Sequence, residues 1–343
     1  MKKLKDEVIP SPSLPTTVTT RPAPFSFGRL REYGQTYGTF GALILLIIFN
    51  IIVTPHFLST QTLSINLYQV AETVILAMGM TLVIATGGID LSIGSVMSIA
   101  GSMAALIFVG RIFSLSGPIS YVIAILVALL VAGLCGLFNG ILVTAFRIQP
   151  IVATLILYIA GRGIAEVLVN GVVDFSNPTF QFIGTGTILG IPFQVFVMLL
   201  IVIFFNWLVR GTVFGSQVVA TGGNEAAARL AGIPVARVKL AVYITMGFLA
   251  GIAGVFYISN NSSADPGGIG LGMELNAIAA VAVGGSSLLG GQANIPGTFI
   301  GAVFIQLLTS TLTANNVSAD LSRVVEALLI ILAVYLQKQR KAA

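Results

Sequence analysis

The stretch Leu67–Ala85 reads LYQVAETVILAMGMTLVIA and contains a single charged residue, Glu72. A helix of about 20 mainly apolar residues is long enough to cross a bilayer, so this stretch predicts a transmembrane helix. Further runs of the same character follow along the chain. They are Thr39–Val53, Leu91–Val109, Ile119–Val143, Ile151–Val169, Ile191–Val209, Leu240–Ile258, Ile295–Thr313 and Leu321–Leu336.

A shorter apolar run, Leu275–Val283, cannot cross a bilayer alone and ends at Gly284 and Gly285. We expect a half-helix or a re-entrant segment there, with its backbone shielded by protein. The composition agrees with a membrane protein, because 56% of the 343 residues are hydrophobic and 8% are charged, whereas soluble domains carry roughly 25% charged residues. The sequence predicts an all-α polytopic membrane protein with about ten transmembrane helices in one domain, residues 36–343.

Basic residues predict how the chain lies in the membrane, since Lys and Arg collect in short cytoplasmic loops. Residues 1–35 are rich in Lys, Arg and Pro and predict a flexible basic tail. Ten crossings place this tail, the polar loop 211–239 and the basic C-terminus together in the cytoplasm, whereas nine crossings would put the C-terminus outside. We therefore expect both termini to be cytoplasmic.

The chain lacks the residue groups that most catalytic and metal sites require. His56 is the single histidine and Cys135 the single cysteine, which excludes a histidine-containing triad, a multi-histidine metal site and an internal disulfide. No GxxxxGK[ST] phosphate-binding motif occurs, and we expect no cofactor. If ATP drives this protein, another subunit must hydrolyse it.

The loop 211–239 contains a short predicted helix. Asn224 can cap its N-terminus, Glu225 lies in its first turn, and Gly232 ends it after an alanine-rich stretch. A helix of about two turns is marginal in water, so either the membrane surface or a partner protein must hold it. On spacing alone, a simple surface connector is the alternative.

Three motifs carry a resemblance to a known family. The run Gly222–Ile233, GGNEAAARLAGI, followed by Val235 and Lys239, resembles the coupling-loop motif of the ribose, xylose and galactofuranose family of ATP-binding-cassette sugar permeases. A second run, Met78–Gly94 (MGMTLVIATGGIDLSIG), is similar to another signature of that family. The third motif combines Phe138-Asn139-Gly140 with Pro150–Leu155 and Arg162-Gly163.

The resemblance implies a permease with the fold of type II ATP-binding-cassette importers, which moves a pentose or hexose across the bacterial inner membrane. It implies an ATP-binding subunit, an extracytoplasmic sugar-binding protein and a second permease, either identical or a paralogue, as partners. The chain itself would be a transport subunit in membrane lipid, neither an enzyme nor a nucleic-acid-binding protein. The residues implied in coupling to the ATPase are Gly223, Asn224, Glu225, Ala228, Arg229, Leu230 and Gly232.

Polar residues and glycines inside the apolar segments are candidates for the translocation path or its gate, because ionisable groups in a membrane usually face a cavity or a partner. Asp90 and Ser92 can cap the helix that follows them. The sequences around Gly87-Gly88 and Gly284-Gly285 resemble each other, which suggests similar roles for the two breaks. The path candidates are Gly87, Gly88, Asp90, Ser92, Asn139, Gly284 and Gly285.

Three further side chains carry explicit expectations. Arg162 and Glu166 lie four residues apart on one predicted helix and are expected to form a structural ion pair within the membrane. Glu72 is expected near the outer end of its helix, where it can snorkel to the interface. Ala228 is expected to present a small, flat surface to the groove of an ATPase.

The residues leave other transporter classes open. An ion-coupled secondary transporter would use Asp90, Glu72 or Glu166 as a proton or sodium site, but it has no need for a docking helix in the loop 211–239. A related ATP-binding-cassette permease for branched-chain amino acids or nucleosides would share the fold. The sequence does not name the sugar.

Overall fold

The computed structural model describes residues 27–113, 117–176 and 178–318, together with 321–322, 324–325, 327–328 and 331. Most of the predicted basic tail, 1–35, and most of the predicted final helix, Leu321–Leu336, therefore lie outside the described residues. The helices are α1 Phe27–Val53, α2 Thr60–Ala85, α3 Ile93–Phe108, α4 Pro118–Thr144, α5 Pro150–Val169, α6 Pro178–Thr185, α7 Phe193–Gly211, α8 Val213–Gly223, α9 Glu225–Leu230, α10 Val235–Asn261, α11 Met273–Val283 and α12 Ile295–Ala314.

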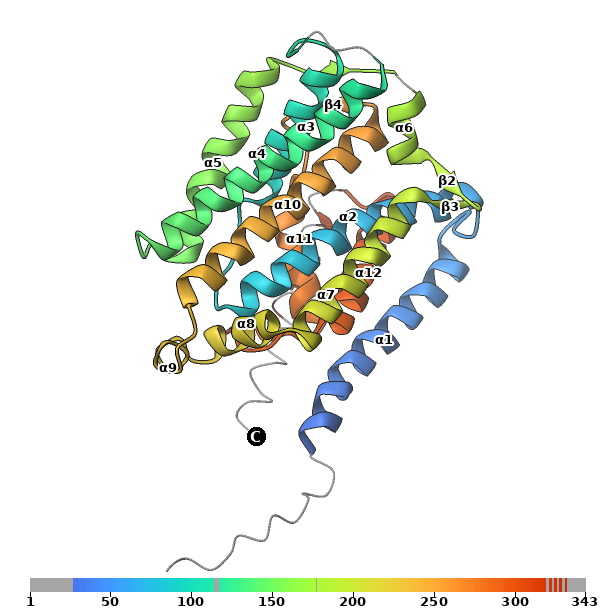
Figure 1. Ribbon diagram of the computed structural model, residues 1–343. Helices are drawn as coiled ribbons and strands as arrows, with labels where there is room; N and C mark the ends of the chain where they lie inside the picture. The colour runs from blue at the N-terminus through green and yellow to red at the C-terminus, as the bar shows by residue number, and fades with distance from the viewer. Residues whose placement is uncertain are drawn as a thin grey trace, which may run out of the picture.

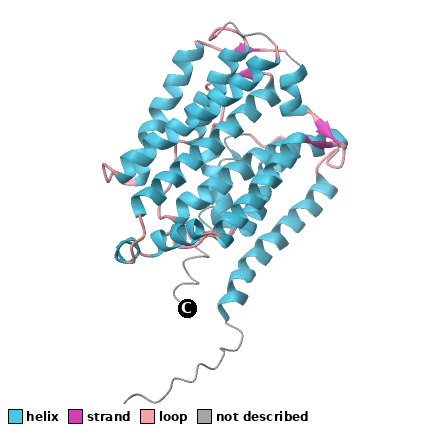
Figure 2. Ribbon diagram, in the orientation of Figure 1, coloured by secondary structure: helices cyan, strands magenta, loops and turns pink. Residues whose placement is uncertain are grey.

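Strands make a small contribution to the fold (Figure 2). β1 Val173–Asp174 pairs antiparallel with β4 Ser263–Ala264, in the register Val173 with Ala264. β2 Thr187–Ile188 and β3 Ile191–Pro192 form a second antiparallel pair, a tight hairpin.

Among the described residues, six helices are long and apolar enough to cross a membrane: α2, α4, α5, α7, α10 and α12. Shorter apolar helices occupy Gly38–Val53, Ile93–Phe108 and Met273–Val283. Every predicted apolar run up to Thr313 overlaps one of these nine segments, so the prediction of a polytopic all-α membrane protein is confirmed. The predicted count of ten crossings is not confirmed by the described residues.

α11 matches the expected half-helix. It has 11 residues, which at 1.5 Å per residue span about half of a hydrocarbon core of about 30 Å. Gly272 precedes it in the left-handed conformation, with φ of 80°, and Gly284 ends it. An irregular segment, in which Pro266, Ile269 and Gly270 are buried, therefore leads into the helix.

α2 is the centre of the bundle and contacts α7, α10, α11 and α12 (Figure 1). Every residue from Val70 to Ala85 is buried. A helix that is apolar all round has no preferred outward face, so either other helices or lipid can cover it. The packing of α7, α10, α11 and α12 around α2 decides its central place.

Glycine allows the most extensive helix pair, α4 with α10, to approach backbone to backbone. A Cβ atom on Gly136 would lie 2.3 Å from the carbonyl oxygen of Tyr243, and one on Gly247 would lie 2.3 Å from that of Ala132. Small residues at such crossings are typical of membrane bundles, where lipid supplies no hydrophobic drive for association.

The bundle has two distinct ends (Figure 1). We call the end with α8, α9 and the α4–α5 connection the α9 end, and the end with α6 and the strand pairs the α6 end. The loop 211–239 differs from its prediction, because α8 occupies most of its first half. The sequence analysis missed this helix, although Thr212 caps it by accepting a hydrogen bond from the backbone N–H of Gly215 at 3.2 Å.

Candidate functional site

α9 is a short helix with a complete cap at each end. The Asn224 side-chain oxygen accepts from the backbone N–H of Ala227 at 3.0 Å, as the sequence predicts. At the other end Gly232 has φ of 81° and donates to the carbonyl of Arg229, while Ile233 donates to the carbonyl of Ala228. These two bonds form a Schellman motif, which satisfies carbonyls that the helix end would leave unpaired.

Charged contacts fix α9 on the end of α10. Glu225 pairs with Arg229 one helical turn away, and Lys239 of α10 donates to the other carboxylate oxygen of Glu225 at 2.6 Å. The hydrogen bond from Lys239 is the main reason why the pKa of Glu225 lies below its ordinary value, with a further contribution from Arg229. α9 is thus held to α10 across the loop that contains Gly232.

Two side chains of α9 point in opposite senses. Leu230 is 91% exposed, whereas Ala228 is 4% exposed and packs inside this chain. The expectation that Ala228 presents a surface to an ATPase groove is therefore wrong, because the helix turns that residue towards its own bundle. Leu230 is the apolar side chain that α9 offers outward.

A cavity of about 230 Å³ opens beside α9. Arg147 and Gln149 of the α4–α5 connection line it together with Glu225, Arg229 and Lys239. Arg147 is exposed and its backbone is left-handed, with φ of 55°. The α9 end therefore combines one exposed leucine with a pocket whose lining includes three basic side chains, two of them paired with Glu225.

The break after α2 begins with a second Schellman motif. Gly87, with φ of 82°, donates to the carbonyl of Ile84, and Gly88 donates to that of Val83. The break after α11 repeats this geometry: Gly285 has φ of 85° and donates to Ala282, and Ser286 donates to Val281. The sequence similarity between the two breaks therefore corresponds to the same local backbone structure.

Asp90, Ser92 and Asn139 lie together, although Asn139 comes from α4. The Asp90 carboxylate accepts from the backbone N–H of Ser92 at 2.8 Å and from its hydroxyl at 2.7 Å. Asn139 donates to the Ser92 hydroxyl oxygen at 2.7 Å. All three side chains are buried. Asp90 therefore holds the chain at the start of α3, whereas the Ser92 side chain forms no cap of its own.

Two residues that the sequence analysis did not select complete this region. The Leu91 backbone N–H donates to the Thr154 hydroxyl of α5 at 3.1 Å. The hydroxyl of Tyr243 lies where a Cβ atom on Gly88 would be 2.6 Å away. Among the described residues, the Tyr243 hydroxyl and the Asn139 carbonyl oxygen are buried without a hydrogen-bond partner.

Arg162 does not form the predicted ion pair with Glu166, both of which the structure describes. Its guanidinium instead donates to the carbonyls of Pro266 and Gly267 at 2.8 Å each and to that of Ile269 at 3.2 Å. Glu166 is exposed on α5. The planar guanidinium fork suits several carbonyls of an irregular segment better than one neighbour on its own helix.

Glu72 also differs from its prediction, because its side chain is 3% exposed and hydrogen-bonded inside the bundle instead of extending outward. Its carboxyl group accepts from the Asn260 side chain of α10 at 2.6 Å, and Asn260 accepts in turn from Gln194 of α7 at 2.8 Å. This buried chain of polar groups joins three helices, as hydrogen bonds between membrane helices often do.

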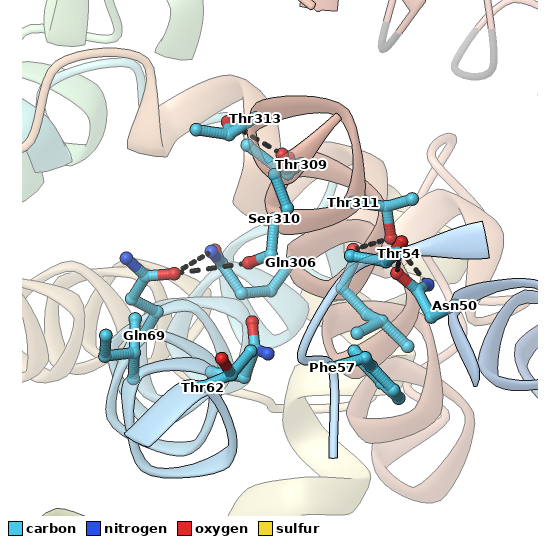
Figure 3. Close-up of a pocket in the computed structure, with 14 residues that line it drawn as sticks. Asn50, Thr54, Phe57, Thr62, Gln69, Gln306, Thr309, Ser310, Thr311 and Thr313 are labelled. Carbon is cyan, nitrogen blue, oxygen red and sulfur yellow. Dashed lines mark hydrogen bonds between the residues drawn. The ribbon is translucent and has the colours of Figure 1, made fainter. Parts of the chain in front are cut away.

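An uncharged polar cavity of about 270 Å³ lies between α1, α2 and α12 towards the α6 end. Figure 3 shows its two hydrogen-bonded groups: Gln69 accepts from Gln306 and Ser310, and Asn50 donates to Thr311. These amides and hydroxyls satisfy one another. These hydrogen bonds join α1 to α12 and α2 to α12, so contacts between helices account for the polar side chains in this cavity.

The chain is similar to known proteins over most of its length. Residues 62–334 match the family model described as branched-chain amino acid transport system / permease component. The chain belongs to this family. The permease is therefore a multi-pass membrane protein of the transport class that the motifs around Gly87 and Asn224 indicate.

Curated relatives of this permease are sugar transporters. It is 38% identical to the galactofuranose transporter permease protein YtfT of Escherichia coli K12, over 87% of this chain and 88% of that protein. It is 37% identical to the ribose import permease protein RbsC of the same strain, over 88% and 92%. The L-arabinose ABC transporter permease protein AraH of Azospirillum brasilense is 33% identical, over 84% of each chain. The resemblance to sugar permeases is confirmed.

Proposed function

We propose that this permease is the membrane-spanning subunit of an ATP-driven importer that carries a monosaccharide across the inner membrane, coupled through α9 to a separate ATP-binding subunit. The observation that carries the proposal is Leu230, which is 91% exposed on an ordered helix beyond the spanning segments. An exposed apolar side chain on an ordered helix gains free energy when a docked partner buries it.

The surroundings of Leu230 support a docking role. Both caps and the Glu225 contacts order α9 before any partner binds, so docking costs little conformational entropy. The neighbouring basic pocket with Arg147 suits acidic side chains of a partner. Gly223, Asn224 and Gly232 shape the two ends of this helix, and Arg229 contributes charge to its outer surface.

The orientation of the protein follows from this role. The α9 end faces the cytoplasm, where ATP is available, and both termini are cytoplasmic in agreement with the distribution of basic residues. The α6 end then receives sugar from an extracytoplasmic binding protein. The names of the relatives support a sugar as substrate. An identical or paralogous permease is the second subunit of the proposed complex.

The translocation path runs past the two breaks. Gly87 and Gly88 with Asp90 and Ser92 form one candidate gate, and Gly284 and Gly285 belong to the other. The unpartnered oxygen of Asn139 supports this assignment, because a buried acceptor without a donor can receive a hydroxyl group of a passing sugar. Glu166 supports a second permease beside α5, because an ionisable group facing lipid is costly.

The test uses Leu230→Ser with Leu189→Ser as a matched control. Leu189 is 96% exposed in the β2–β3 hairpin at the α6 end. Co-expression with the ATP-binding and sugar-binding subunits, followed by reconstitution in liposomes, gives ATPase co-purification and ATP-dependent uptake of labelled pentoses and hexoses. We expect Leu230→Ser to lose ATPase co-purification and uptake, and Leu189→Ser to keep the ATPase bound.

Normal ATPase binding in Leu230→Ser would show that α9 is only a connector. Uptake that follows a proton or sodium gradient without ATP would instead favour an ion-coupled transporter that uses the buried carboxyl groups of Glu72 or Asp90.

A further inference from the structure

We propose that four glycines, Gly87, Gly222, Gly290 and Gly291, form a rigid junction that passes movement of α8 and α9 to both breaks at the same time. We call this set the glycine junction. The inference rests on the proposed function, because the movement comes from an ATPase docked on α9. It adds Gly222, Gly290 and Gly291, which are not among the site residues selected above, as positioning residues.

The first contact joins α8 to the end of α2. A Cβ atom on Gly222 would lie 1.8 Å from the carbonyl oxygen of Ala85 and 2.8 Å from the backbone nitrogen of Gly291. No side chain fits into that space. The Gly291 N–H donates to the same Ala85 carbonyl at 3.0 Å, so the loop after α11, the end of α2 and the end of α8 meet at one carbonyl group.

The second contact joins the two breaks to each other. A Cβ atom on Gly290 would lie 3.0 Å from the carbonyl oxygen of Gly222 and 3.0 Å from the nitrogen of Gly87. Gly290 and Gly291 have φ of 87° and 76°, a left-handed conformation that only glycine adopts readily. Both the close approach and the backbone conformation therefore require glycine here.

Backbone contacts transmit displacement better than side-chain contacts do. A side chain can change rotamer and absorb a small shift, whereas close-packed peptide groups leave no such slack, and the Gly291–Ala85 hydrogen bond also resists their separation. α9 follows α8 after Asn224 alone, and α10 holds α9 through Lys239. A shift of α9 therefore acts on the end of α8 and, through the junction, on the chain that leads to Asp90.

The same shift reaches the other break. The loop from Gly284 to Asn294 is tied to the start of α12, because Asn294 donates to the Gly284 carbonyl at 3.1 Å and accepts from Gly297 at 3.1 Å. Both breaks begin with the same Schellman geometry, and Gly290 of the second break lies against Gly87 of the first. The junction thus couples the two candidate gates to a single docking helix.

The chain offers a matched pair for the test. Gly41 also lies in a helix, α1, but a Cβ atom on Gly41 would meet nothing within 4 Å in the described part of the chain. Gly222→Ala and Gly41→Ala introduce the same methyl group, one inside the junction and one away from it. Each is co-expressed with the ATP-binding and sugar-binding subunits and reconstituted in liposomes, where uptake, ATP hydrolysis and co-purification of the ATPase are measured.

We expect Gly41→Ala to match the unsubstituted protein. Gly222→Ala should retain the ATPase and hydrolyse ATP, while sugar carried per ATP falls at least about fivefold, the lower end of typical coupling effects. Equal transport per ATP in the two variants would overturn the junction. Absence of ATP-driven uptake in the unsubstituted complex would contradict the proposed function instead, so the two failures are distinguishable.

A measurement without substitution covers the case in which Gly222→Ala fails to fold. Hydrogen exchange is followed in the unsubstituted complex with and without ATP. We expect the segments 86–92 and 284–294 to change protection together, because both depend on the Ala85–Gly291 contact. A change in only one segment, or in neither while uptake proceeds, would overturn the inference.

Discussion

α2 and α5 both cross the membrane, yet they satisfy their polar groups in different ways. In α2, 83% of the most apolar stretch is buried within the chain, against 28% in α5. Glu72 of α2 meets Asn260 of the same chain. α5 divides its charges, because Arg162 binds carbonyls of its own chain while Glu166 faces outward.

The comparison separates two kinds of charged residue in a membrane helix. A charge in the central helix has every partner inside the protomer, so its removal affects folding. A charge on the outer face of a peripheral helix has its partner elsewhere, in a second subunit or in the path, so its removal affects assembly or transport. The predictions below test this division.

The largest effect should come from removing core volume. Ile75 of α2 is fully buried and Ile159 of α5 is 67% exposed. Ile75→Ala should lower the free energy of unfolding by about 2–5 kcal/mol, because its packed neighbours cannot fill the cavity. Ile159→Ala should have a much smaller effect. Thermal unfolding in detergent, followed by circular dichroism, measures both, and equal losses would contradict the central place of α2.

The next effect concerns Arg162. Arg162→Ala leaves the carbonyls of Gly267 and Ile269 without this donor, at a cost of about 1.5–3 kcal/mol for hydrogen bonds to a charged group. We expect faster hydrogen exchange in residues 263–272. Arg210→Ala, at the exposed end of α7, is the control. Unchanged exchange in 263–272 would mean that Arg162 does not hold this segment.

Glu72 and Glu166 provide a direct contrast. Glu72→Leu leaves the buried amide of Asn260 without its acceptor and should cost about 1–3 kcal/mol, whereas Glu72→Gln keeps an acceptor oxygen and should cost less. Glu166→Leu should leave protomer unfolding unchanged. If Glu166→Leu destabilised the protomer as much as Glu72→Leu, the division between inward and outward charges would be wrong.

The smallest effect on stability should come from Glu225. Its side chain is 40% exposed, as on an outer face, yet its ion-pair partner Lys239 belongs to the same chain. Because Lys239 lowers the pKa of Glu225, its contacts stabilise α9 above the ordinary carboxyl value of 4.5 and are lost as the pH falls through the lowered value. Solvent screening limits the gain to a few tenths of a kcal/mol.

Hydrogen exchange of the α9 amides, corrected for intrinsic rates, should therefore quicken below pH 4.5. The Glu225→Gln variant should show this faster exchange already at neutral pH and respond little to acid. If exchange in Glu225→Gln still quickened in acid to the same extent, the pH dependence would belong to a group other than Glu225.

Local patterns predicted local structure well. The cap at Asn224 and the stop at Gly232 follow from residues a few positions apart, and the structure has both. The same reasoning missed α8, whose Thr212 cap lies within a stretch treated as loop. It also failed for Ala228, because the direction in which a short helix turns depends on the surface beneath it.

Side chains that bind across the bundle could not be predicted. The sequence predicts an ion pair between Arg162 and Glu166, because spacing along the chain reveals only contacts within one helix. In the structure the partners of Arg162 lie in the distant segment that begins at Pro266. Glu72 was placed at the interface because nothing near it in sequence accounts for a buried carboxyl group. Its partner, Asn260, lies on another helix.

The sequence by itself determined the membrane class, the apolar helices up to Thr313, the half-helix α11 and the form of α9. These properties depend on composition, on helical length and on caps, which act over a few residues. Only the tertiary structure decided that α2 is central, that Asn139 reaches Ser92, and that Gly222 meets Ala85 and Gly291. Those contacts join distant segments, and their energies exist only once the helices have packed together.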